Sequence, residues 1–374
     1  MWARWSKHRP TPLRERSFDK AIPRGLWSCR EQKSRFTSQK RTNKKGEKRM
    51  YQGCGRVIKS NGGLFTVRLF LDATRAPMPL DGMTVTGRGR GSLHRRGSLL
   101  VGDVVKVTYD NTAYSKDEEG NIKCAEDGTG VAIDEILPRK NALIRPPMAN
   151  LDLLFVTLSA TTPDPVLETV DKLISIAEHN NIEPVIVITK SELAPDVAEG
   201  LADIYRRAGF EVFCVGKGMP ITALEERIAK IRGGTVAAFS GASGVGKSTL
   251  LNRLFPNLQL QTGEISRRIE RGKNTTRVTE LYPLTDGEDC GYLADTPGFT
   301  MLDFERFDFF EKEDLPLTFR EFAPYIGECR YTKCSHTKEE GCAILAAVRR
   351  GDVPKTRHQS FLSLYEVLKK KTKW

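Results

Sequence analysis

The segment GASGVGKST, residues 241–249, constrains the fold of this chain more than any other stretch. It matches G-x-x-x-x-G-K-[S/T], follows the strand-like run TVAAF and precedes the helix-like run STLLNRLF. Its glycines let backbone N–H groups close around phosphate, while Lys247 supplies a cation to the β- and γ-phosphates and Ser248 a hydroxyl to Mg²⁺. The segment therefore predicts a nucleoside triphosphate site. We expect contacts from Gly241, Ala242, Ser243, Gly244, Val245, Gly246, Lys247, Ser248 and Thr249, with Lys247 also acting in catalysis.

The segment YLADTPGF, residues 292–299, supplies a second part of the same site. Asp295 ends a strand-like run, where a carboxylate can hold Mg²⁺ through water. Gly298 follows at the D-x-x-G spacing, so its N–H can contact the γ-phosphate. Between the two motifs, Thr275 and Thr276 can complete the Mg²⁺ shell with a hydroxyl, although a Thr-rich strand start is the alternative interpretation.

Strand-like and helix-like runs alternate from about residue 150 to residue 305, which predicts a doubly wound α/β domain with a parallel sheet. The strand candidates are LDLLFVTLSA, PVIVITK, EVFCVG, TVAAFSG and CGYLADTPG. Three amphipathic helix candidates lie between the first four strands: PVLETVDKLISIAEHNN, VAEGLADIYRRAG and ITALEERIAKIRGG.

The tetrapeptide TKSE, residues 189–192, follows the second of these strands and is a variant of the guanine-reading loop N-K-x-D. Guanine recognition needs a carboxylate that accepts from N1–H and the 2-amino group, and a lysine stem over the base; Lys190 and Glu192 have that spacing. The loop comes about fifty residues before the phosphate loop, but loops at the carboxyl ends of parallel strands converge whatever their order. We assign base contacts to Thr189, Lys190, Ser191 and Glu192. The alternative is a strand followed by an ordinary turn.

Cys329, Cys334, His336 and Cys342 fall within 14 residues. Three thiolates and one imidazole make a closed tetrahedral Zn²⁺ set, and because no ligand position is left open we expect one structural zinc. Unliganded cysteines are the alternative. The chain has no secretory signal and no apolar run of transmembrane length, so we expect a cytoplasmic protein in a reducing environment, which favours metal over disulfides.

Short strands and Gly-rich turns occupy the region from about residue 51 to residue 140, beginning with the hairpin GRVIKSNGGLFTVRLF. Five or so strands in about 90 residues predict a small β-barrel, and an OB-fold fits this size. The loop GRGRGSLHRRGS carries four arginines, which contact an RNA backbone or belong to a solvated loop. These arginines are Arg88, Arg90, Arg95 and Arg96.

The net charge of +12 is concentrated at one end of the chain. Residues 1–49 hold 16 Lys and Arg against 4 Asp and Glu, whereas the remainder holds 43 of each sign. The basic balance therefore does not argue that the folded body binds nucleic acid. We expect residues 1–49 to be a disordered leader or to precede the true first residue, Met50; an RNA-binding arm and a transit peptide are the alternatives.

Over residues 50–374 the chain resembles the circularly permuted GTPases of the RsgA/YjeQ family. The resemblance rests on the order of its parts, which are a barrel, then the motifs T-K-x-E, G-x-x-x-x-G-K-S, T-T and D-T-P-G, and finally the segment CRYTKCSHTKEEGC. The resemblance implies an OB-fold domain at 50–145, a permuted P-loop GTPase domain at 146–305 and a helical zinc-binding domain at 306–374. It also implies GTP and GDP as ligands, late maturation of the 30S subunit through 16S rRNA, and ribosome-stimulated GTP hydrolysis that triggers release. We expect a monomer.

Three positions depart from the family pattern. Asn274 replaces a histidine that precedes the Thr-Thr pair and positions water, and Phe299 stands where Ras-like proteins keep glutamine. Where the family has a Ser-Ala segment beside the guanine base, this chain has Val215-Gly216-Lys217. These departures, with Thr189 and Glu192 in place of Asn and Asp, predict weak intrinsic turnover and looser guanine selectivity. We assign catalytic roles to Lys247, to Thr276 through the Mg²⁺ shell, and to Asn274 at the position that orients the attacking water.

Two other function classes compete with this interpretation. One is an ATP-dependent P-loop enzyme in which TKSE is accidental, and nucleotide competition separates the two. The other is a non-catalytic RNA-binding module with a structural nucleotide, against which Lys247, Ser248 and Asp295 argue. Because the segment after Asp295 continues into the zinc region, we also expect the γ-phosphate state to reorient residues 306–374 on RNA.

Overall fold

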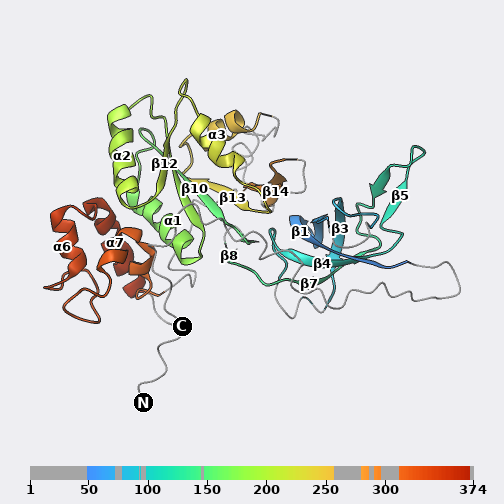
Figure 1. The fold of residues 1–374 in the computed structure, drawn as a ribbon, viewed down its shortest axis with the longest axis horizontal. Helices are drawn as coiled ribbons and strands as arrows, with labels where there is room; N and C mark the ends of the chain where they lie inside the picture. The colour runs from blue at the N-terminus through green and yellow to red at the C-terminus, as the bar shows by residue number, and fades with distance from the viewer. Residues whose placement is uncertain are drawn as a thin grey trace, which may run out of the picture.

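The computed structural model describes residues 49–71, 78–91, 93, 98–144, 147–256, 279–285, 290–295 and 311–370. Several predicted features lie outside these ranges: the leader through residue 48, Asn274, Thr275, Thr276, Gly298 and Phe299. Along the long axis of the molecule, the C-terminal helices, the α/β sheet and a β-barrel follow one another, so the α/β part lies between the other two (Figure 1).

The barrel consists of strands β1 (Tyr51–Asn61), β2 (Leu64–Leu69), β3 (Thr84–Gly89), β4 (Val104–Tyr109) and β7 (Val131–Ile136). It closes because β1 pairs with both β2 and β4, while β7 joins β4 to β3. The β3–β7 pairing is parallel and the others are antiparallel, so the predicted five-stranded OB-fold is confirmed. The hairpin of β5 (Tyr114–Lys116) and β6 (Ile122–Cys124), which lies between β4 and β7 in the sequence, extends away from the barrel (Figure 1).

The α/β part contains five parallel strands in the order β12-β11-β10-β13-β15, with β14 (Glu280–Pro283) antiparallel beyond β15. Their bounds are β10 (Leu153–Ser159), β11 (Glu183–Thr189), β12 (Glu211–Cys214), β13 (Val236–Gly241) and β15 (Tyr292–Asp295). Every residue of β10 is buried, because helices cover both faces of a parallel sheet. The doubly wound prediction is confirmed.

Alternate residues of the strands pack into two separate hydrophobic cores, one on each face of the sheet. Leu154, Val156 and Ile186 pack with helices α1 (Leu167–His179) and α2 (Pro195–Arg207). Phe155 and Val185, which point to the opposite face, pack with α3 (Thr222–Ala229) and α4 (Lys247–Leu254). The period-2 alternation of strand side chains therefore places α1 and α2 on one face of the sheet and α3 and α4 on the other.

The barrel and the α/β sheet are continuous. Strand β14 pairs with β1 at Glu280 and Lys59, whose side chains also form an ion pair, and the result is one 11-stranded sheet. The chain crosses between the two parts through the hairpin of β8 (Ala142–Ile144) and β9 (Pro147–Ala149). The sequence did not predict β14 or this pairing.

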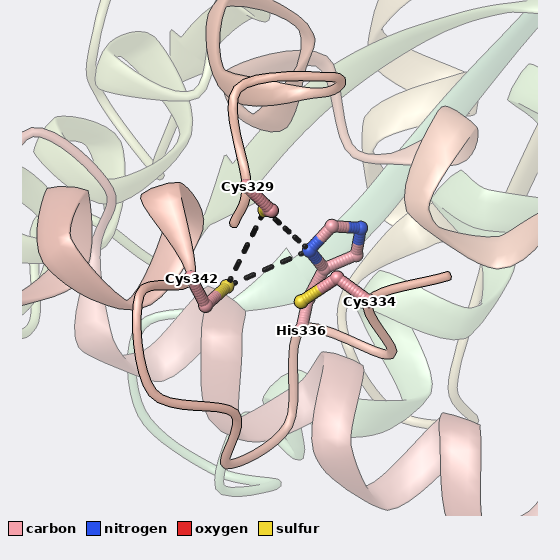
Figure 2. Close-up of side chains that lie close together, drawn as sticks. All are labelled: Cys329, Cys334, His336 and Cys342. Atoms are coloured by element: carbon pink, nitrogen blue, oxygen red, sulfur yellow. Dashed lines mark hydrogen bonds between the residues drawn. The ribbon is translucent and has the colours of Figure 1, made fainter. Parts of the chain in front are cut away.

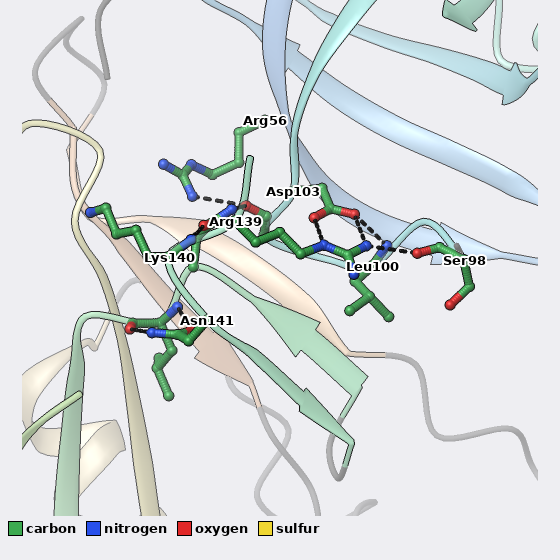
Figure 3. A network of polar contacts seen from close by, with 10 residues as sticks. Arg56, Ser98, Leu100, Asp103, Arg139, Lys140 and Asn141 are labelled. Atoms are coloured by element: carbon green, nitrogen blue, oxygen red, sulfur yellow. Dashed lines mark hydrogen bonds and ion pairs between the residues drawn. The ribbon is translucent and has the colours of Figure 1, made fainter. Parts of the chain in front are cut away.

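A polar network fixes the junction (Figure 3). Asp103, whose side chain is 0% exposed, accepts from Arg139 at both oxygens, 2.6 and 2.8 Å away, and from the Leu100 N–H. The Gly102 carbonyl accepts from Arg56 and Asn150, each at 3.0 Å. A Cβ on Gly102 would lie 2.0 Å from the Ala149 oxygen, so this turn tolerates only glycine.

The C-terminal part is helical, as predicted, and packs on α1. It comprises the 3₁₀ turns η4 (Leu315–Thr318) and η5 (Arg320–Tyr325) and the helices α6 (Ala343–Arg350) and α7 (Lys355–Lys370). The rings of Phe319, Phe322 and Phe361 form its aromatic centre, with centroids 5.0–5.4 Å apart. Across the described ranges, no helix has the length and apolar character needed to span a bilayer.

Candidate nucleotide site and metal centre

The loops that follow β10, β11 and β13 leave the same edge of the sheet. Ser159 pairs in register with Thr189, and Thr157 pairs with Gly241, so the carboxyl ends of these strands are level. Carboxyl ends of parallel strands form the ligand crevice of open α/β sheets. TKSE and the phosphate loop therefore meet at one crevice, although about fifty residues separate them in the sequence.

The phosphate loop has the backbone that its glycines predict. Gly244 and Gly246 have φ of 80° and 92°, a region that disfavours residues with a Cβ. A Cβ on Gly241 would lie 2.4 Å from the Thr157 oxygen. Gly246 is the N-cap of α4, and Lys247 is the first residue of that helix, so the positive end of the helix dipole faces the loop. Val245 is buried and Lys247 is half-buried, whereas Ala242, Ser243, Ser248 and Thr249 are exposed.

TKSE is bonded directly to the phosphate loop. Lys190, held at a φ of 55°, donates from Nζ to the Gly244 carbonyl at 2.9 Å and to the Thr162 carbonyl. The Thr189 hydroxyl is buried; it lies 3.0 Å from the Leu158 carbonyl and within hydrogen-bonding distance of the Val245 carbonyl. Both side chains thus connect the end of β11 to the loop after β13, and the two predicted loops act as one structural unit.

Ser191 and Glu192 complete the tetrapeptide. Ser191 is buried, donates from Oγ to the Ile188 carbonyl at 3.0 Å and from N–H to the Val215 carbonyl at 3.2 Å. The Glu192 Oε2 atom is buried and has no hydrogen-bond partner within the described part of the chain. Because an unpaired buried carboxylate oxygen is costly, this atom is suited to accept from a ligand.

Arg253, which the sequence did not mark as functional, connects α4 to the loop after β12. It donates to the Gly216 carbonyl at 2.9 Å and to the Met219 carbonyl. The helix that begins at the phosphate loop therefore also fixes the segment from Gly216 to Met219. An exposed arginine in an amphipathic helix gives no sequence signal for such a role.

The structure describes only part of the remaining prediction. The backbone of Asp295 ends β15, next to β13 in the sheet, as a Mg²⁺-holding carboxylate requires. Asn274, Thr276 and Gly298 lie outside the described ranges. Of the loop arginines, Arg95 and Arg96 also lie outside, while Arg90 forms an ion pair with Asp134 at 2.5 Å.

Cys329, Cys334, His336 and Cys342 come together at one point, with ligand atoms all within 4.8 Å of one another (Figure 2). The Cys329 and Cys342 sulfurs are 3.8 Å apart, and each lies 3.5 Å from His336 Nδ1. Tetrahedral zinc with Zn–S of about 2.3 Å and Zn–N of about 2.0 Å would place sulfurs about 3.8 Å apart and sulfur and nitrogen about 3.5 Å apart. The cluster therefore has the dimensions of a Cys₃His metal site.

The surroundings of the cluster also suit a cation. Burial raises the pKa of Cys334 to about 12, so its thiol stays protonated at neutral pH unless a cation offsets the charge. The N–H groups of Ala343 and Leu345 point at the sulfurs of Cys329 and Cys342, at 3.4 and 3.5 Å. Both contacts favour thiolates.

Glu339 organises the loop between the ligands. Its carboxylate accepts from the N–H groups of Ser335, Thr337 and Lys338 at 2.8–3.1 Å. Burial alone would raise the pKa of Glu339, but these hydrogen bonds, led by those from Ser335, lower it to about 2. His358 of α7 faces the His336 carbonyl at 3.0 Å, which links the loop to the helical core.

An OB-fold barrel, a phosphate loop that follows the adjoining TKSE loop in the sequence, and a Cys₃His cluster are the features of a circularly permuted P-loop GTPase. The model of the RsgA GTPase family matches residues 136–305. The small ribosomal subunit biogenesis GTPase RsgA of Alkaliphilus metalliredigens is 39% identical over 290 residues, which cover 77% of this chain and 91% of that protein. Its counterpart from Caldanaerobacter subterraneus subsp. tengcongensis is 36% identical, covering 76% and 89%. This chain belongs to the RsgA family and is a GTPase.

Solved structures agree with this assignment. YloQ, described as a circularly permuted GTPase, aligns with a TM-score of 0.64 at 29% identity, covering 87% of this chain and 97% of YloQ. YjeQ from Thermotoga maritima aligns with a TM-score of 0.65 at 26% identity, covering 86% and 100%. The similarity therefore extends over the barrel, the GTPase sheet and the C-terminal helices together.

Proposed function

We propose that this protein binds the 30S ribosomal subunit late in its assembly and hydrolyses GTP in a ribosome-stimulated step that triggers its own release. The named relatives are small ribosomal subunit biogenesis GTPases. The observation that carries the proposal is the bonding of Lys190 and Thr189 to the phosphate loop, because it makes one site from two motifs in permuted order.

The base of GTP lies, in this proposal, beside TKSE. The Glu192 carboxylate accepts from guanine N1–H and the 2-amino group, which satisfies the oxygen that is otherwise buried without a partner among the described residues. The stem of Lys190 covers the base, and Thr189 and Ser191 hold the loop. Adenine has neither donor in that arrangement, so GTP and GDP are preferred over ATP.

The phosphates lie along residues 241–249, with Lys247 neutralising the charge that develops during transfer. Ser248 and Asp295 would hold Mg²⁺, and the sequence adds Thr276 and the Gly298 N–H. The cation neutralises charge on the phosphate oxygens when bound. We assign orientation of the attacking water to Asn274. An amide is a weaker base than histidine, which fits slow intrinsic turnover and completion of the site by the ribosome.

The C-terminal part, residues 306–374, holds one structural Zn²⁺ through Cys329, Cys334, His336 and Cys342. The OB-fold at 50–145 binds 16S rRNA, and the GTPase domain at 146–305 carries the switch. No function is assigned to the basic residues 1–49. The protein works as a monomer in the cytoplasm, where it meets the assembling subunit.

GTP hydrolysis measured with and without purified 30S subunits tests this proposal. Wild-type protein should turn over slowly alone and about tenfold faster or more with 30S, Lys247→Ala should be inactive in both conditions, and Asn274→Ala should lose most of the stimulated rate. Fast turnover without ribosomes that 30S does not change would overturn it. No hydrolysis in either condition would favour a non-catalytic RNA-binding module.

A further inference from the structure

Gly216 and Glu192 are in close contact across the base-reading side of the crevice. A Cβ on Gly216 would lie 2.0 Å from Glu192 Oε2 and 2.9 Å from both Glu192 Cδ and the Met219 sulfur. None of these distances is compatible with a carbon atom at that position. The Glu192 carboxylate, which makes the shortest contact, therefore occupies most of the volume that a side chain at residue 216 would fill, with the Met219 side chain beside it.

The need for glycine at this position comes from space and not from the backbone. Gly216 does not have a positive φ, so an alanine could adopt its conformation without strain. Gly218, two residues later, has a φ of 78°, but a Cβ added there would meet nothing within 4 Å. Glycine is therefore needed for different reasons at the two positions of the VGKG segment. Gly218 is needed for its backbone conformation, whereas Gly216 is needed because the Glu192 carboxylate lies against it.

The wall that faces Glu192 is fixed, whereas the carboxylate is the movable partner. Arg253 holds the carbonyls of Gly216 and Met219, and the Ser191 N–H donates to the Val215 carbonyl. No donor among the described residues holds the Glu192 Oε2 atom, and the long side chain of Glu192 can rotate away. A side chain at residue 216 would thus displace the carboxylate and leave the loop in place.

We propose that Gly216 is a specificity-determining residue of the base site, and that it compensates for the extra methylene of Glu192. The inference rests on the proposed binding of guanine beside TKSE. A shorter aspartate leaves room for a side chain at residue 216, whereas glutamate does not. Serine or alanine at 216 is therefore compatible with aspartate at 192, and glycine at 216 with glutamate.

A double-mutant cycle tests the proposal. Gly216→Ala, Glu192→Asp and the double variant are compared for binding of GDP, IDP and ADP by titration calorimetry, with thermal unfolding as a check on folding. IDP lacks the 2-amino group, so the ratio of its Kd to that of GDP reports the carboxylate contact. Gly200→Ala is the matched control, since Gly200 lies in α2 with nothing within 4 Å of a Cβ and an ordinary φ.

Gly216→Ala should raise the Kd for GDP by roughly tenfold, about 1.4 kcal/mol, and bring the IDP-to-GDP ratio towards one, with an unchanged unfolding temperature. Adding Glu192→Asp should recover most of that loss, so the two effects are not additive. Wild-type GDP affinity in Gly216→Ala, or additive effects, would overturn the inference while the proposed function stands. A wild-type protein that does not prefer GDP to ADP would overturn both.

Discussion

Arg357 of α7 and Asp171 of α1 form an ion pair that water does not reach, with Nη1 2.5 Å from Oδ1 and side chains 0% and 1% exposed. Arg357 also donates to Glu321 at 2.7 Å and lies over the Phe319 ring. Burial would lower the pKa of Arg357, but Asp171 and Glu321 raise it above the usual arginine range. The pair therefore joins the C-terminal part to the GTPase sheet.

Replacement of Arg357 should separate these two parts. Arg357→Ala leaves two buried carboxylates without their cation, and such losses cost about 3–5 kcal/mol. Urea unfolding should show that decrease in the free energy of unfolding. Arg206→Ala, which removes the exposed pair with Glu199, is the matched control and should cost less than about 1 kcal/mol. Equal stability of the two variants would contradict the role of Arg357.

The same pair limits how the C-terminal part can move. A reorientation of residues 306–374 with the γ-phosphate state must either carry α1 along or break the Arg357–Asp171 contact. The expectation that the γ-phosphate state reorients residues 306–374 on RNA, which came from the sequence alone, stays a prediction. In the described residues, Arg320 adds a second attachment by donating to Glu178 and Glu183 at 2.6–3.0 Å.

Loss of the Lys190 contact should weaken nucleotide binding without unfolding the protein. Hydrogen bonds from charged groups contribute about 1.5–3 kcal/mol, so Lys190→Ala should raise the Kd for GDP roughly tenfold to a hundredfold. Fluorescent GDP titration measures the change. Lys230→Ala, at the exposed C-cap of α3, is the control and should bind normally. Wild-type affinity in Lys190→Ala would show that the two loops form the site independently.

Removal of the metal should unfold the C-terminal part selectively. Purified protein should contain about one zinc per chain, and Cys334→Ser should contain much less, because three ligands hold zinc poorly. Elemental analysis and circular dichroism after chelation measure both effects. Cys124→Ser, in the β5–β6 hairpin, should keep its zinc. Metal-free wild-type protein with an intact C-terminal part would contradict the zinc assignment.

Disruption of the Arg139–Asp103 pair should loosen the barrel on the GTPase sheet. Arg139→Ala removes the cation from the fully buried Asp103 and leaves the Leu100 N–H as a neutral donor to it, which should cost about 3 kcal/mol or more. Hydrogen exchange should rise in residues 98–103 and 139–151. If exchange rises only at residue 139 and its neighbours, the network in Figure 3 does not hold the junction.

Much of the fold could be predicted because local patterns dictate it. The apolar run of β10 has to be buried on both faces, and the phosphate loop has to join a strand to a helix. The residue types and the spacing of Cys329, Cys334, His336 and Cys342 indicate a metal site without any knowledge of the fold. These features depend on residues that are neighbours in the sequence, so no knowledge of the tertiary structure was needed.

The features that the sequence did not reveal depend on distant partners. Strand β14 has four residues, and its contact with β1 joins Glu280 to a lysine 221 residues away. Arg357 and its partner Asp171 are 186 residues apart in the sequence, so no local pattern pairs them. From the sequence, Gly216 was interpreted only as a departure from the Ser-Ala segment of the family. The folded structure shows that the Glu192 carboxylate lies where a side chain at residue 216 would be.

Affinity for the 30S subunit in the two nucleotide states tests the central claim most directly, because that claim makes the guanine site the control of ribosome binding. Sedimentation of 30S subunits with the wild-type protein, in GDP or in a non-hydrolysable GTP analogue, measures it. We predict binding about tenfold tighter or more with the analogue, and loss of that difference in Lys247→Ala. Equal affinity of the wild-type protein in GDP and in the analogue would contradict the account.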